Sequence, residues 1–239
     1  MPHTMLTVSQ AARHICIPEK QLRHLALQNE IPCIKKGDQF FFEHRQLDDW
    51  AQQRIMRLSP NHLKQHHLRV AAEHNRNISD DHMLEKLLTV DRIHPELKSK
   101  TKPGLIRDMV KAASDTGLLN DEEYLHRELL AREEIGSTAI GDGAALLHNR
   151  YFDKYTFEES FIVLGRTVKP LFFGCQNGGP TDIFFLICCI DDELHLHVLA
   201  RICMLIHGTE LMPSLRAAET AEDMFNTLRS AEQELLREL

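Results

Sequence analysis

Apolar positions near the start of the chain recur at helical spacing, with polar residues between them. From Val8 to Ile15 they follow the i, i+3, i+4, i+7 pattern of one buried helix face, and residues 7–10 form a capping box that opens this helix. A second helix is predicted over residues 19–29, because Pro18 suits a first helical turn. The inward residues of this second helix are Leu22, Leu25 and Ala26.

The pattern then changes to the alternation of short strands. Residues 33–35 and 39–42 alternate between apolar and polar side chains, and the Lys-Gly-Asp sequence at residues 36–38 predicts a tight turn between them. A third short helix follows, with Leu47 and Trp50 on its inner side. Residues 1–55 are therefore expected to form a small helix-turn-helix module in which the hairpin is a wing.

Residues 56–82 are polar, helix-prone and rich in histidine. Ser59 and Pro60 predict the start of a helix that runs to about residue 74, but its apolar stripe is thin. We expect a helical linker, which is also a candidate dimer contact. The polar residues 76–81 predict the boundary with the next domain.

Three histidines of this linker have spacings that a zinc site uses. His62, His66 and His67 lie within two helical turns, yet no cysteine or carboxylate joins them. Solvated side chains are therefore expected, and no metal site is predicted in the chain.

Residues 83–239 have the pattern of one α/β domain. The apolar runs 161–164 and 183–190 have strand length and predict strands covered on both faces, and residues 93–97 predict a third strand. Helices are predicted over residues 103–116, before residue 131, and after the acidic pair at residues 191–192. The expected fold class is α/β, with a central sheet flanked by helices.

Composition limits the class of protein. With 43% hydrophobic and 26% charged residues, the chain is typical of globular domains. No apolar stretch of about 18 residues occurs, so we expect a cytoplasmic protein without a membrane partner. The six cysteines form no C-x-x-C pair, which is typical of a reducing compartment. Residues 1–76 carry a formal charge of +4 and the rest −11, so the two parts are expected to have different partners.

A glycine-rich run over residues 131–150 ends close to His148. Such a run can bring backbone N–H groups to an anion, and a neutral imidazole beside them is a candidate phosphoryl acceptor. A surface loop with a packed histidine explains the same pattern. The residues expected to surround the phosphate are Arg132, Ser137, Thr138, Gly141 and Gly143.

This run resembles the active-site signature of the type-2 EIIA domains of the bacterial phosphotransferase system, the mannitol, fructose and nitrogen-related branch. Ala144, Leu147 and Asn149 depart from that signature. The matching residues are Arg132, Glu133, Gly136, Ser137, Thr138, Ile140, Gly141, Gly143, Ala145 and His148.

The resemblance covers residues 83–235 and implies a mixed sheet flanked by helices over residues 83–239. It implies that His148 is phosphorylated by phosphorylated HPr or a homologue, with His195 beside it and Arg132 holding phosphate oxygens. It implies no cofactor and no metal, because the phosphoryl group arrives already activated.

The N-terminal module resembles the excisionase-like branch of the MerR-type winged helix-turn-helix domains. The residues that match are Leu6, Thr7, Val8, Ala11, Ala12, Ile31, Pro32, Lys35, Gly37, Leu47 and Trp50. This resemblance implies binding of double-stranded DNA, and the modest charge favours a homodimer. The candidate DNA contacts are Lys20, Gln21, Arg23, His24, Lys35 and Lys36.

Together these features predict a transcriptional regulator whose DNA-binding module is controlled by an EIIA-like domain. The alternatives are an EIIA phosphocarrier of a sugar or nitrogen phosphotransferase system, whose module docks a protein, and a regulatory scaffold that is not phosphorylated.

Overall fold

Thr7 ends the first strand and caps the first helix. In the computed structural model, which describes residues 5–73, 83–149, 155–175 and 177–239, Thr7 and Gln10 exchange both hydrogen bonds of the expected capping box. Two helices and a hairpin follow in the predicted order, and the hairpin pairs with an additional strand, in the order β1-β3-β2. These elements are β1 (Met5–Thr7), α1 (Val8–His14), α2 (Glu19–Leu27), β2 (Ile34–Lys36), β3 (Gln39–Glu43) and α3 (His44–Ile55).

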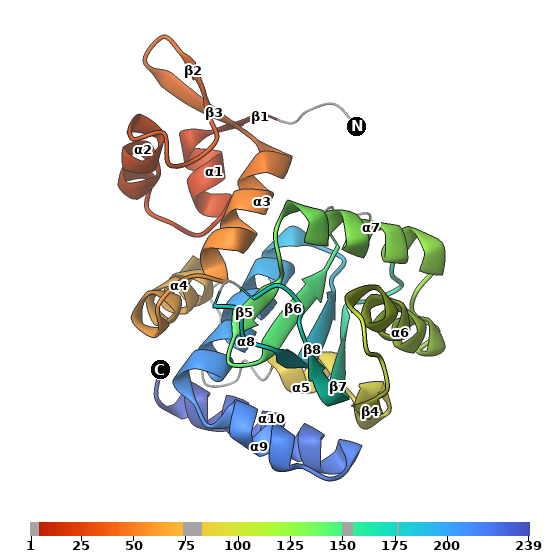
Figure 1. The fold of residues 1–239 in the computed structure, drawn as a ribbon. Helices are drawn as coiled ribbons and strands as arrows, with labels where there is room; N and C mark the ends of the chain where they lie inside the picture. Colours follow the sequence, from red (N-terminus) through yellow and green to blue (C-terminus); the bar gives the residue numbers. More distant parts are fainter. Residues whose placement is uncertain (1–4, 74–82, 150–154, 176) are drawn as a thin grey trace.

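Two helices join this module to the rest of the chain. Helix α3 and helix α4 (Pro60–Glu73) both contact the long helix α8 (Asp192–Gly208), and Figure 1 shows the module connected through them to one side of the larger domain. The buried apolar residues of the module and those around α8 form one continuous core. The module therefore packs onto the second domain.

The packing of α4 corrects the expectation of solvated histidines. His66 and His67 are 5% and 1% exposed, and the ring of His67 meets the ring of His197 at a centroid distance of 5.0 Å. His62 is exposed, as expected. The thin stripe of α4 faces α8, a contact that the local sequence pattern does not contain. The predicted boundary at residues 76–81 lies outside the described residues.

The second domain is built on a mixed five-stranded sheet in the order β4-β7-β8-β6-β5. Strands β4 and β7 are parallel, β7 and β8 antiparallel, β8 and β6 parallel, and β6 and β5 antiparallel. The expected strands at residues 93–97, 161–164 and 183–190 are confirmed, and the second is longer than predicted. The strands are β4 (Ile93–Leu97), β5 (Ala139–Gly141), β6 (Ala144–His148), β7 (Phe161–Leu171) and β8 (Thr181–Cys188).

Helices cover both faces of this sheet, which explains why its strands are apolar throughout (Figure 1). One face packs on α6 and α7 through Met109, Leu125 and Phe184, while the other packs on α8 through residues such as Phe185 and Leu199. The remaining helices are α5 (Met83–Leu87), the short 3-10 helix η2 (Val90–Arg92), α6 (Lys102–Asp115), α7 (Glu122–Ile135), α9 (Leu211–Ala217) and α10 (Ala221–Arg237).

A buried ion pair joins the helices on the α8 side. The guanidinium of Arg201 on α8 lies 2.7 Å from the carboxylate of Glu232 on α10, and both side chains are at most 1% exposed. The same carboxylate accepts hydrogen bonds from the backbone N–H groups of Leu84 and Glu85. One side chain thus connects α5, α8 and α10.

No single helix within the described ranges has the length and hydropathy of a membrane span. Helices α8 and α9 pass that test only together, across a bend of 83°.

Candidate phosphoryl-acceptor site

His148 is the last residue of β6, and its side chain is fully buried. The glycines before it do not form a loop around the imidazole. Gly141, Asp142 and Gly143 have positive φ and form the turn between β5 and β6, at the opposite end of the strand from His148. Four residue steps along a strand span roughly 13 Å. The expectation that Gly141 and Gly143 hold a phosphate at His148 is therefore wrong.

The hydrogen bonds of His148 fix its tautomer. Its Nδ1 atom lies 2.8 Å from the carbonyl oxygen of Leu146, so Nδ1 carries the proton and donates it. Burial holds the pKa of His148 well below its usual range, and the charge of Arg132 and the neighbouring His195 lower it further. The ring is therefore neutral, and Nε2 is unprotonated and has a lone pair, as a nucleophile requires.

Arg132 and His195 lie at this nucleophilic atom. The Nε–H of Arg132, at the C-terminal end of α7, donates to Nε2 of His148 at 3.0 Å, and its Nη1 donates to the carbonyl of Gly136. His195, in the first turn of α8, places its ring 5.1 Å from that of His148, between centroids. Burial lowers the pKa of His195 to about 3, so this ring is also neutral. The structure thus brings all three predicted residues together.

The sequence analysis missed a fourth residue, Gln52 on α3. Its amide oxygen Oε1 lies 3.1 Å from Nε2 of His148, and its side chain is fully buried. Because an unprotonated Nε2 can only accept a hydrogen bond, the amide of Gln52 bonds best to it with its NH2 group turned toward the ring. Gln52 covers the face from which a phosphoryl group would approach. The local sequence gives no sign of this role. Asp48 and Gln52, one helical turn apart, are both buried on α3, although polar residues at such positions usually face solvent.

The chain resembles known proteins over the domain that contains His148. The sequence profile described as "Phosphoenolpyruvate-dependent sugar phosphotransferase system, EIIA 2" matches residues 86–231. The chain belongs to this family. The match places the EIIA domain over residues 86–231.

Relatives of the EIIA domain include nitrogen regulatory proteins and a fructose-specific component of the phosphotransferase system. A nitrogen regulatory protein of Bradyrhizobium diazoefficiens is 31% identical over 145 residues, which are 59% of this chain and 92% of that protein. The fructose-specific EIIABC component of Bacillus subtilis is 27% identical over 147 residues, 61% of this chain but 23% of that protein. The crystal structure of IIA-Ntr from Neisseria meningitidis has a TM-score of 0.55 at 21% identity, covering 61% of this chain and 99% of its own, and supports the fold.

Two other predicted phosphate ligands, Ser137 and Thr138, form hydrogen bonds to neighbouring groups of the EIIA domain. The hydroxyl of Ser137 donates to the carbonyl of Phe173 and accepts from the N–H of Ala139. Thr138 donates both its hydroxyl and its backbone N–H to the carboxylate of Glu133. In this state both residues hold the segment after α7 in place, and neither hydroxyl contacts His148 in the described hydrogen bonds.

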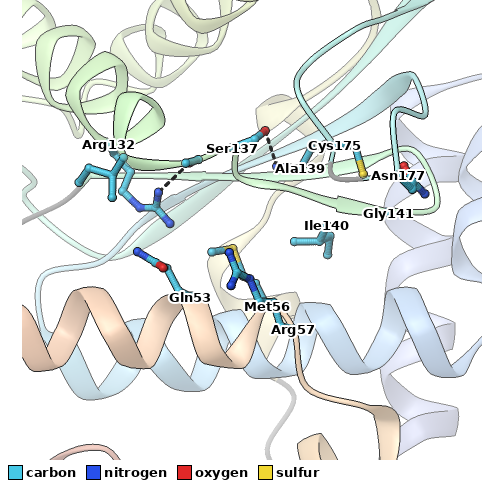
Figure 2. A pocket seen from close by; sticks show the side chains of 12 residues that line it. Gln53, Met56, Arg57, Arg132, Ser137, Ala139, Ile140, Gly141, Cys175 and Asn177 are labelled. Atoms are coloured by element: carbon cyan, nitrogen blue, oxygen red, sulfur yellow. Dashed lines mark hydrogen bonds between the residues drawn. The ribbon is translucent and has the colours of Figure 1, made fainter. Parts of the chain in front are cut away.

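An opening lies beside Arg132, between α3 and the segment that leads into β5. Figure 2 shows Gln53, Met56 and Arg57 on one side of this pocket, and Ser137, Ala139 and Gly141 on the other. Arg132 also lines this pocket. A ligand in the pocket can therefore reach the guanidinium that donates to Nε2 of His148. The second guanidinium, of Arg57, gives the pocket a positive wall.

The three departures from the family signature are packed inside the EIIA domain. Ala144 and Leu147 are part of β6 and pair with Ile183 and Leu186 of β8, and both are at most 2% exposed. Asn149 is 1% exposed. Leu147 continues the strand where the signature has a proline, which lacks an N–H donor. The imidazole is therefore positioned by a regular strand end.

The predicted DNA contacts lie mostly on the surface of the module. Lys20, Arg23 and His24 on α2 are exposed, and so are Lys35 and Lys36 on β2. The ammonium groups of the two β2 lysines each lie 5.8 Å from a phenylalanine ring centre of β3.

Gln21 differs from these residues. It is half-buried and lines a pocket with Trp50 and His66, between α2, α3 and α4. Gln21 is therefore less exposed than the other candidate DNA contacts.

Proposed function

We propose that Nε2 of His148 accepts a phosphoryl group from a phosphohistidine protein of the HPr class. The observation that carries this proposal is the unprotonated Nε2 of a neutral, buried imidazole. Arg132 donates a hydrogen bond to this atom, and the ring of His195 lies beside it. The phosphorus–nitrogen bond of the donor breaks as the new bond to Nε2 forms, and the leaving imidazole takes up a proton. Arg132 then neutralises negative charge on the transferred group.

Acceptance requires that the side chain of Gln52 moves. Gln52 and Arg132 both occupy the hydrogen-bonding direction of Nε2, and His148 has no exposed surface. A phosphoryl group placed there would overlap the side chain of Gln52. We propose that α3 moves together with Gln52, which couples the N-terminal module to the chemistry of the EIIA domain.

Incubation of the chain with phosphorylated HPr is expected to add one phosphoryl group, seen by intact mass and lost in acid. Gln52→Ala is expected to accelerate this transfer at least tenfold, because it opens space at Nε2. The matched control is Gln53→Ala, which changes the neighbouring side chain at the pocket rim and should react like the parent. Absence of any mass gain in the parent and in Gln52→Ala would favour the scaffold alternative.

For the module itself, we propose double-stranded DNA as the partner. The exposed face of α2 carries two cations, and two further lysines project from the adjacent hairpin, so one surface offers both a helix for a groove and cations for phosphates. The formal charge of +4 over residues 1–76 is modest, and two copies are needed for a stable complex. DNA binding by the module would make the chain a transcriptional regulator. If the module does not bind DNA, the alternative of an EIIA phosphocarrier is favoured.

Arg23→Ala and Lys35→Ala are expected to weaken binding to selected duplexes several-fold, because each removes one phosphate contact. Lys35→Ala should also reduce the dependence of log affinity on log salt by about one unit. Lys169→Ala, an exposed lysine of β7, is the control. Gel-shift titration at two salt concentrations measures both effects, and equal affinities of all four proteins would assign the module to protein contacts.

A further inference from the structure

Four metal-ligand side chains meet where the N-terminal module touches the EIIA domain. His14 comes from α1, His44 and Asp48 come from α3, and Asp192 opens α8. One donor atom from each lies within 4.8 Å of the other three. The four side chains are between 8% and 31% exposed, so the cluster lies at the edge of the interface and is accessible to an ion.

The distances between donor atoms in this cluster are close to those between the ligands of a metal ion. His14 Nε2 lies 2.5 Å from one oxygen of Asp48, and His44 Nδ1 lies 3.1 Å from the other. His44 Nε2 lies 3.4 Å from an oxygen of Asp192. In a tetrahedral zinc site with bonds of about 2.1 Å, neighbouring donor atoms are roughly 3.4 Å apart. The donor atoms of the cluster, all within 4.8 Å of one another, lie at distances on both sides of this value.

The charges of the cluster also suit a divalent cation. With both histidines deprotonated, as binding of a metal ion requires, the cluster has a formal charge of −2. Among the described residues, the ion-pair partners of Asp48 and Asp192 are these histidines, and no lysine or arginine pairs with either carboxylate. Mixed nitrogen and oxygen donors favour zinc over magnesium or calcium, which prefer oxygen alone.

We propose that His14, His44, Asp48 and Asp192 bind one Zn²⁺ ion at the junction of the module and the EIIA domain. Three ligands come from the module and one from α8, so the ion links the two parts. Gln52 lies one helical turn after Asp48, and His195 lies three residues after Asp192. The ion therefore fixes α3 in the position where Gln52 covers His148. Binding of the ion does not depend on the proposed phosphoryl transfer.

The test uses the full chain after treatment with a chelator, titrated with Zn²⁺ alone and with Mg²⁺ for comparison. Calorimetry and metal analysis are expected to find one Zn²⁺ per chain, bound at least tenfold more weakly by His44→Gln and by Asp192→Asn. His62→Gln removes an exposed histidine of α4 outside the cluster and should bind Zn²⁺ like the parent. This control is needed because the chain has 15 histidines.

Asp192→Asn separates a site shared between the two parts from one confined to the module. Zn²⁺ is expected to raise the melting temperature of the parent and much less that of this variant, since binding to the folded state stabilises it by mass action. Melting of the metal-free proteins reports whether the substitutions alter the fold. Unchanged Zn²⁺ affinity in both cluster variants, or no preference for Zn²⁺ over Mg²⁺, would overturn the proposal.

Discussion

Replacing His148 with alanine is expected to abolish acid-labile phosphorylation completely, although 14 other histidines remain. The reason is local, because His148 combines a neutral ring, a bare Nε2 and a guanidinium that donates to it. The measurement is intact mass after incubation with phosphorylated HPr, repeated after acid treatment.

Two further variants define what the His148 result means. His195→Ala is expected to slow the transfer by roughly 10²-fold without abolishing it, as for the loss of one donor to a developing charge. His207→Ala, at the far end of α8 where it pairs with Asp142, should have no effect. Labelling that persists in His148→Ala would place the acceptor elsewhere.

Glu232→Ala is expected to lower the free energy of unfolding by about 3–5 kcal/mol, because it leaves the buried charge of Arg201 without its partner. It also removes the acceptor for the N–H groups of Leu84 and Glu85. Urea denaturation followed by circular dichroism measures the change. Glu234→Ala, an exposed position on the same helix, should change it by less than about 0.5 kcal/mol.

The double variant Arg201→Leu with Glu232→Leu separates a lost ion pair from an unpaired charge. It should regain much of the stability that Glu232→Ala loses, since no charge then remains buried. A loss in Glu232→Ala as small as that in Glu234→Ala would show that water reaches Arg201 in the variant.

Local pattern was sufficient to predict most of the fold. Capping at Thr7, the apolar runs that became β7 and β8, and the helices α6 and α8 each depend on residues close in sequence. The strands β1, β5 and β6 were not predicted. The first two have only three residues each, and β6 was interpreted as part of a glycine-rich loop. The glycines at 141 and 143 were misinterpreted because a tight hairpin and an anion-binding loop both need positive φ.

The parts that the sequence did not predict are contacts between distant segments. His67 meets His197 from 130 positions away, and Gln52 meets His148 from 96 positions away. Neither pair has a spacing that identifies it, because each partner is an ordinary helix or strand residue in its own segment. The proximity of His195 to His148 was expected only from the family resemblance, which carries information about tertiary structure that composition and periodicity lack.

The contact of Gln52 with His148 would link two events thermodynamically, the release of the module and the phosphorylation of His148. If docked and released modules interconvert, a ligand that binds only the released module and a phosphoryl group that fits only the released site must assist each other by the same factor. A chain that is released one per cent of the time would react with its donor with an apparent affinity a hundredfold below the intrinsic value. Occupancy of the module by its target would restore that affinity, so the target would report its own presence to the phosphotransferase system.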